Sequence, residues 1–134
     1  MNIAPWLVRL GLLVAALIHL APLAAVAGAS MLSRMYGVVT EDPSLLLLLQ
    51  HRALLFGLLG SLSLAAMWRV ELRSPALLAA LVSMSGFLLL GAESMSSSAL
   101  NAEVNRVWWV DLIALPCVLS GAVAQLWSRR RGRG

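Results

Sequence analysis

Long apolar segments separated by short polar ones dominate this sequence. The apolar segments cover residues 6–29, 45–68, 75–95 and 107–127. Each is near or above the ~20 residues that a helix needs to cross ~30 Å of hydrocarbon at ~1.5 Å per residue. Segments of this length satisfy their backbone hydrogen bonds in lipid as helices. The pattern therefore predicts an all-α membrane protein, an antiparallel four-helix transmembrane bundle that forms one domain over residues 1–134.

The composition agrees with a chain that has the lipid bilayer as its partner. Hydrophobic residues make up 60% of the chain and charged residues 12%, with a mean hydropathy of +0.88, whereas soluble domains carry about 25% charge. The pI of about 11.1 is explained by arginines that follow the last apolar segment and anchor the topology. No nucleic-acid partner is expected, and anionic lipid headgroups are the alternative for this tail.

The arginines also predict the orientation. If the four segments alternate across the membrane, seven arginines fall on one side: Arg9, Arg69, Arg73, Arg129, Arg130, Arg131 and Arg133. The other side receives three: Arg34, Arg52 and Arg106. The positive-inside rule then places both termini and the loop 69–74 in the cytoplasm. The first segment exceeds the usual core of about 7–15 residues in a signal peptide, so we expect it to be retained.

Ionisable side chains occur within all four segments, in the outer half of the membrane. Counted inward from the outer ends at ~1.5 Å per residue, His19 lies about 15 Å deep, His51 about 9 Å, Arg52 about 10 Å, Glu93 about 3 Å and Asp111 about 6 Å. A charge that faces lipid costs roughly 2.5 to 3.5 kcal/mol on insertion scales. We therefore expect Arg52 to be buried between helices, within hydrogen-bonding distance of Glu93 or Asp111.

This cluster has a structural and a functional interpretation. In the first, the ionic network only fixes the register of the helices. In the second, the planar fork of Arg52 holds an anionic or carbonyl-bearing ligand in a cavity, and His51 serves as a switchable donor. The candidate ligand-binding residues are His19, Tyr36, His51, Arg52, Glu93 and Asp111. No catalytic residue is assigned.

Metal sites have weaker support. A haem between His19 and His51 needs matching depths, and theirs differ by about 6 Å at ~1.5 Å per residue. A zinc site from His51, Glu93 and Asp111 lacks a closely spaced pair of ligands. The cofactor is therefore left open, with no metal predicted.

Local signals mark two helix features. Asp42 followed by Pro43 predicts an N-cap and the first residue of the second helix. The first outer loop, Ser30 to Ser44, is the longest predicted connection. Pro22 and Pro116 remove backbone hydrogen bonds and predict kinks in the first and fourth helices.

The segments Met35-Tyr36-Gly37, Glu41-Asp42-Pro43 and 48–57 (LLQHRALLFG) resemble a group of small four-span inner-membrane proteins of proteobacteria. The resemblance implies a bacterial inner membrane and no established activity. Some of these proteins carry the label phosphopantetheine adenylyltransferase, an α/β enzyme whose Gly-His motif this chain lacks. The architecture is also similar to DoxX-like four-helix membrane proteins, some of which work beside quinones.

Three functions follow as hypotheses. The first is binding, and perhaps transport or transfer, of a small anionic or amphiphilic ligand in an outer-leaflet pocket. The second is a quinone-linked or lipid-headgroup-modifying enzyme that uses His51 and an acidic partner. The third is a non-catalytic accessory subunit, since an oligomer or a larger membrane complex is compatible with the sequence.

Overall fold

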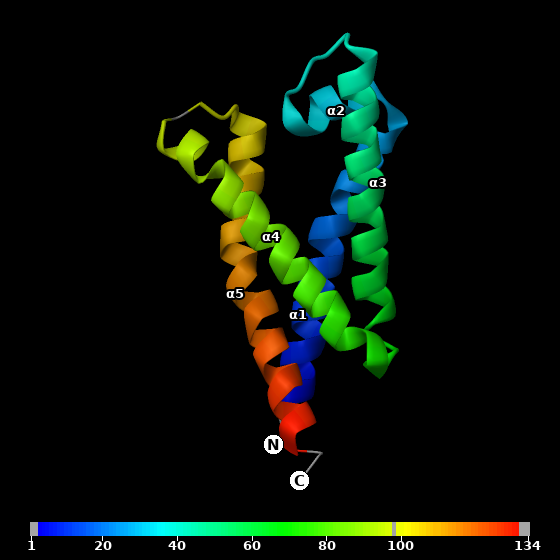
Figure 1. Cartoon of the computed structure of the whole chain (residues 1–134), viewed down its shortest axis with the longest axis vertical. Coiled ribbons are helices and arrows are strands. Elements are labelled where there is room, and N and C mark those ends of the chain that lie inside the picture. The colour runs from blue at the N-terminus through cyan, green and yellow to red at the C-terminus, as the bar shows by residue number, and fades with distance from the viewer. Residues whose placement is uncertain (1–2, 98, 132–134) are drawn as a thin grey trace.

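The computed structural model describes residues 3–97 and 99–131 and shows a bundle of helices (Figure 1). Four helical segments are long and apolar enough to span a membrane: Ala4–Ala27, Pro43–Ala65, Val70–Ser96 and Ala102–Arg131. The described residues contain no β-strand. The predicted fold class is confirmed, and the architecture is that of a multi-pass membrane protein. Arg133, counted above in the topology argument, lies outside the described residues.

The first span changes its helix type partway. The α-helix α1 (Ala4–Leu20) continues as a 3₁₀ helix, η1 (Ala21–Ala27). The change coincides with Pro22, which has no N–H to donate and so interrupts the α-helical hydrogen bonds. A kink was predicted at this proline, and the structure has a change of helix type there.

A short helix occupies most of the predicted outer loop. Gly28, with φ of 121°, turns the chain into α2 (Ala29–Tyr36), and Gly37 ends this helix in the left-handed conformation with φ of 62°. Leu32 of α2 is buried against Ala25 and Ala53. The sequence predicted a long connection here and did not predict a helix within it; Met35 and Tyr36 of α2 also pack against this cluster.

The second helix begins where the sequence predicts. In α3 (Pro43–Ala65), the carboxylate of the N-cap Asp42 accepts a hydrogen bond of 2.9 Å from the N–H of Ser44. A turn with the short 3₁₀ helix η2 (Val70–Leu72) then leads into α4 (Arg73–Ser96). The last span, α5 (Ala102–Arg131), continues through Pro116 as one helix.

Glycines let the backbones of neighbouring spans approach closely. A Cβ added at Gly121 of α5 would lie 2.9 Å from the carbonyl oxygen of Leu7 and 3.3 Å from the Cα of Gly11, both on α1. A Cβ at Gly60 of α3 would lie 2.8 Å from the backbone nitrogen of Leu20. Such contacts stabilise membrane helices where hydrophobic burial gives little driving force. α1 therefore packs directly against both α3 and α5.

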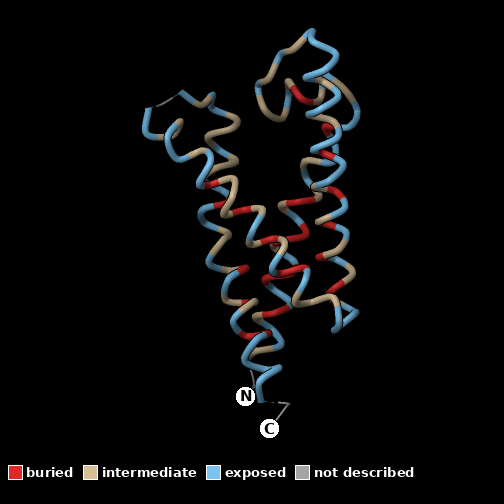
Figure 2. Tube along the Cα trace, in the orientation of Figure 1, coloured by how far each residue is buried: buried red, intermediate tan, exposed pale blue. Residues whose placement is uncertain are grey.

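The bundle has a narrow end and a splayed end. α3 and α4 are joined through η2 and separate from one another toward the end of the bundle where α2 lies. The molecule therefore forms a V (Figure 1). One arm of the V contains the upper part of α3 with η1 and α2, and the other contains α4 and α5. The larger core cluster, with Leu12, Leu77, Met84 and Val118, joins the arms, and buried residues crowd the middle and the narrow half (Figure 2). The splayed end thus leaves space between the arms.

Each arm contains a hydrogen bond that joins two of its helices. In one arm, the indole Nε1 of Trp108 on α5 donates to the carbonyl of Leu88 on α4 at 3.2 Å. In the other, the Gln50 side chain of α3 donates to the carbonyl of Val26 in η1 at 2.9 Å. These bonds hold the helices within an arm and leave the faces between the arms for the site.

Candidate functional site

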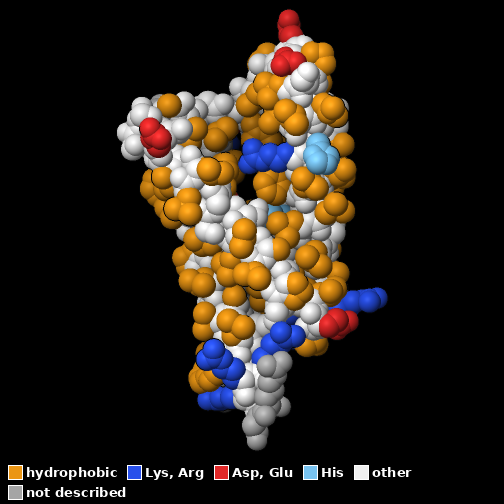
Figure 3. All heavy atoms as spheres, viewed as in Figure 1, with side chains coloured by type: hydrophobic (Ala, Val, Ile, Leu, Met, Phe, Trp, Pro, Cys, Tyr) orange, Lys and Arg blue, Asp and Glu red, His pale blue; other side chains and the backbone are white. Residues whose placement is uncertain are grey.

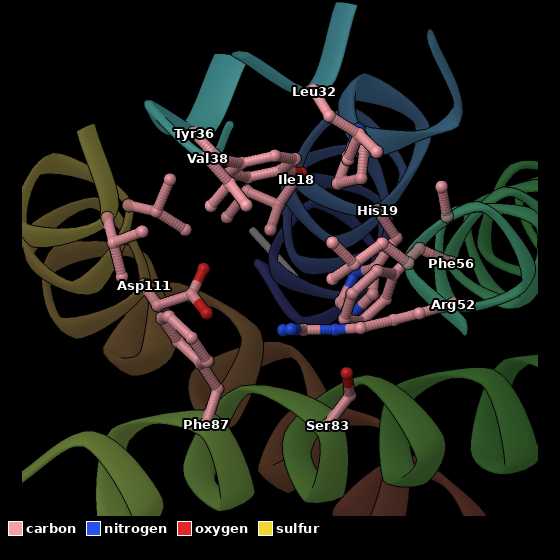
Figure 4. Close-up of a pocket in the computed structure, with 15 residues that line it drawn as sticks. Ile18, His19, Leu32, Tyr36, Val38, Arg52, Phe56, Ser83, Phe87 and Asp111 are labelled. Carbon is pink, nitrogen blue, oxygen red and sulfur yellow. The ribbon is translucent and has the colours of Figure 1, made fainter. Parts of the chain in front are cut away.

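A cavity of about 130 Å³ lies between the arms at the splayed end. Figure 3 shows the hollow there, bordered mainly by apolar side chains with a basic side chain inside it. Residues from α1, η1, α2, α3, α4 and α5 line the cavity, and Figure 4 shows how their side chains converge. The lining is therefore assembled from the whole chain and from no single local motif.

Arg52 extends from α3 into this cavity (Figure 4). Leu49, Arg52, Ala53 and Phe56 recur at helical spacing and form one face of α3,. The guanidinium carbon lies 5.1 Å from the ring centroid of Phe56 and 5.8 Å from that of Phe87 on α4. These distances fit cation–π contacts on two sides. The aromatic rings thus hold the guanidinium in place while its N–H donors are left for another partner.

Asp111 of α5 faces Arg52 across the cavity (Figure 4). Its side chain is only 6% exposed, and its Oδ1 atom has no hydrogen-bond partner. Within residues 3–97 and 99–131, no ion pair of 4.0 Å or less joins Arg52 to a carboxylate. The expected direct bond from Arg52 to Glu93 or Asp111 was therefore wrong. The two charges sit on different arms, and the divergence of the arms separates them.

Arg52 also differs from expectation in its burial. Its side chain is exposed rather than enclosed between helices, because it projects into the open gap of the V. The rings of Phe56 and Phe87 cover part of the guanidinium and shield that part from lipid. The charge is therefore accessible to a molecule that enters between the arms.

His19 lines the cavity from α1. The residue is only 2% exposed, and its Nδ1 is 2.8 Å from the carbonyl oxygen of Ala15. Because a carbonyl can only accept, Nδ1 carries the proton and Nε2 is the remaining polar atom of the neutral ring. The imidazole also packs against Phe56, with ring centroids 5.7 Å apart. His19 is thus a fixed polar element beside the arginine.

Tyr36 closes the cavity from the side of α2 (Figure 4). Burial raises the pKa of its phenol, while the charge of Arg52 lowers this pKa and that of Asp111 raises it. The hydroxyl therefore stays protonated at neutral pH and can both donate and accept. The side chain of Asn101 donates to the backbone carbonyl of Tyr36 at 2.8 Å and caps α5 by accepting from Val104 N–H at 2.8 Å. This contact bridges the two arms above the cavity.

Two of the six candidate residues lie outside the cavity. His51 is exposed on α3, and Glu93 is exposed near the end of α4. Successive helical residues are turned by ~100°, so His51 falls beside the face that carries Arg52. Glu93 likewise falls off the face of α4 that carries Ser83 and Phe87. The sequence prediction placed both in the cavity and is corrected here, whereas His19, Tyr36, Arg52 and Asp111 do line it.

Sequence reasoning missed several lining residues. Phe56 follows Arg52 by one helical turn, a spacing that would have indicated their contact. Nothing in the sequence indicated that Ser83 and Phe87 contact the same cavity, because their distance from Arg52 depends on how α4 is placed relative to α3. Groups of three or more His, Cys, Asp or Glu side chains that could hold a metal ion are absent among the described residues.

Comparison of the chain with protein-family models, with curated proteins and with solved structures finds no significant match. The functional argument therefore rests on the geometry of the cavity.

Proposed function

We propose that this chain is a membrane protein that binds a small amphiphile between the two arms of the V. The apolar part of the ligand packs against Ile18, Leu32, Val104 and Val107, which line the cavity. Its polar part meets Arg52. A mostly apolar site with a few convergent polar groups is the usual form of a small-molecule pocket.

The proposal rests on the contacts of Arg52. Its guanidinium is held by Phe56 and Phe87 and makes no ion pair within the described part of the chain. A group with five N–H donors is suited to bind a ligand oxygen pair in a bidentate manner. An arginine that only fixed helix register would be expected to pair with the carboxylate of Asp111.

The competing enzymatic hypothesis relied on His51 as its titratable group. Because His51 is exposed outside the cavity, the geometry favours binding over that chemistry. For the location, we propose a bacterial inner membrane with both chain ends in the cytoplasm. This orientation is supported by the arginine distribution and puts the cavity toward the outer leaflet, since α1 begins and α5 ends at the narrow end (Figure 1).

The test is a comparison of bound molecules in purified protein. Wild-type chain, Arg52→Gln and Ser83→Leu are extracted in native nanodiscs, and the bound small molecules and lipids are identified by mass spectrometry. Ser83→Leu fills the lining beside Arg52 without removing a charge. Arg106→Gln is the control, because Arg106 is exposed on α5 outside the cavity.

We expect a species that wild type and Arg106→Gln retain and that both cavity variants lose. Circular dichroism and gel filtration establish that each variant is folded. Identical bound material in all four folded proteins would contradict the proposal, and the accessory-subunit hypothesis would then lead.

A further inference from the structure

The cavity carries one charge of each sign, and the two are held apart. Arg52 and Asp111 face one another across the cavity (Figure 4). Within the described residues, however, they form no ion pair, and Oδ1 of Asp111 is buried without a hydrogen-bond partner. Leaving a buried carboxyl oxygen unpaired costs free energy, and a hydrogen-bond donor on a ligand would remove this cost.

This arrangement restricts the charge of a ligand. A purely anionic head would bind Arg52 but would also approach the carboxylate of Asp111, and like charges in a site of low dielectric constant repel strongly. A purely cationic head would meet the opposite difficulty at Arg52. A head that carries both signs satisfies both residues at once.

The donor requirement distinguishes between kinds of cationic group. Quaternary ammonium groups are usually held by aromatic faces, but the rings of Phe56 and Phe87 already flank the guanidinium of Arg52. A primary ammonium instead offers three N–H donors, which fit the unpartnered oxygen of Asp111.

We propose that the ligand of this cavity has a zwitterionic head, in which a phosphate or carboxylate binds Arg52 and a primary ammonium binds Asp111. This inference rests on the proposed function and narrows its ligand class. Two sources share the chemistry: a phospholipid with an ethanolamine headgroup, which enters between the arms, and a soluble zwitterion, which enters from the aqueous side.

The experiment uses the full chain in nanodiscs that contain equal amounts of phosphatidylethanolamine, phosphatidylcholine and phosphatidylglycerol. Lipids that remain bound after release into detergent are counted by native mass spectrometry, and lipids in the cavity are defined as those lost in Arg52→Gln. We expect wild type to retain phosphatidylethanolamine over both other lipids. Asp111→Asn should lower the ratio of ethanolamine to glycerol lipid by about tenfold, since one charge-assisted hydrogen bond is lost. Glu41→Gln, an exposed loop carboxylate, should leave this ratio unchanged.

A second arm tests the soluble source. Free O-phosphoethanolamine is titrated by calorimetry into the chain in nanodiscs of phosphatidylcholine alone. Arg52-dependent binding of the free compound, without selection of the ethanolamine lipid, assigns the zwitterion to the aqueous side; the reverse result assigns it to the bilayer. Either outcome supports the proposal.

The failures are distinguishable. Arg52-dependent binding in which wild type prefers phosphatidylglycerol or phosphatidylcholine would overturn the zwitterion inference and leave the proposed function standing. If folded Asp111→Asn changes neither the lipid ratio nor the binding of free O-phosphoethanolamine, the inference is also overturned. If no lipid and no free compound binds in an Arg52-dependent manner, both the inference and the proposed function are wrong. Should Asp111→Asn fail to fold, wild type still decides the question: it must either prefer phosphatidylethanolamine among the three lipids or bind free O-phosphoethanolamine, and if it does neither the inference is wrong.

Discussion

The crossing of α1 and α5 at Gly121 gives the sharpest stability prediction. In Gly121→Ala the new Cβ would lie 2.9 Å from the carbonyl oxygen of Leu7, whereas C···O contacts normally lie at about 3.3–3.6 Å. The helices must therefore separate by roughly 0.4–0.7 Å. Both nearest atoms, this oxygen and the Cα of Gly11, belong to the backbone, so no side chain can rotate away.

The expected magnitude combines two opposing terms. Overpacking costs about 1–3 kcal/mol, and the replacement of a helical glycine by alanine returns about 0.5–1 kcal/mol. The net effect of Gly121→Ala is a loss of up to about 2.5 kcal/mol. At Gly86 of α4, an added Cβ meets no described heavy atom within 4 Å. Gly86→Ala should therefore be neutral or stabilising by up to about 1 kcal/mol.

The assay is reversible unfolding in mixed micelles by increasing SDS, followed by tryptophan fluorescence and circular dichroism. Gly11→Ala is a variant of intermediate severity, because its Cβ would lie 3.3 Å from the nearest atoms. It should destabilise the protein less than Gly121→Ala does. The expected order of stability is Gly86→Ala, then Gly11→Ala, then Gly121→Ala. If Gly121→Ala were as stable as Gly86→Ala, the close crossing of α1 and α5 would be refuted.

Three further predictions concern single contacts. Asp42→Ala removes the N-cap of α3 and should lower the free energy of unfolding by about 0.5–2 kcal/mol, which thermal denaturation in detergent would detect; an unchanged midpoint would argue against the cap. Asn101→Asp keeps the acceptor that caps α5 but loses the donor to Tyr36, so amide hydrogen exchange should quicken in α2 and not in the first turn of α5; equal protection in α2 would contradict the bridge. His51→Gln should retain the copurifying amphiphile, whereas Arg52→Lys, which loses the planar fork, should retain roughly tenfold less by mass spectrometry, the equivalent of about 1.4 kcal/mol; loss of the amphiphile in His51→Gln would restore that residue to the site.

The spans and the start of α3 could be predicted because their signals are local. A continuous apolar run specifies a membrane helix from its own residues, and Asp42 with Pro43 specifies a helix start within two positions. α2 was not predicted because it is short and Leu32 packs against residues of two other elements, Ala25 of η1 and Ala53 of α3.

The sequence predicted how deep the candidate residues lie in the membrane. It did not predict which side of its helix each residue occupies. The depth count put Arg52 and Asp111 in the same outer half of the membrane, and the structure places both in the same cavity. The same count also included His51 and Glu93, because depth carries no information about which side of a helix a residue occupies. The separation of Arg52 from Asp111 depends on the angle between the arms, which no local pattern encodes.

The bridge between the arms had no sequence signal either. Asn101 and the carbonyl of Tyr36 are 65 residues apart in the chain, and each is unremarkable in its own segment. Gly11 and Gly121 are likewise ordinary glycines of apolar helices until the crossing of α1 and α5 makes their lack of a side chain necessary.

The splay of the arms also affects the membrane around the protein. A V-shaped bundle has a larger cross-section in the leaflet that holds α2 than in the leaflet that holds the narrow end (Figure 1). The protein is therefore a wedge, and lipids must spread further apart in one leaflet than in the other to accommodate it. A wedge of this shape is best matched by a bilayer that bends away from its wide end. From the geometry that opens the cavity we therefore expect the protein to favour a curved bilayer over a flat one.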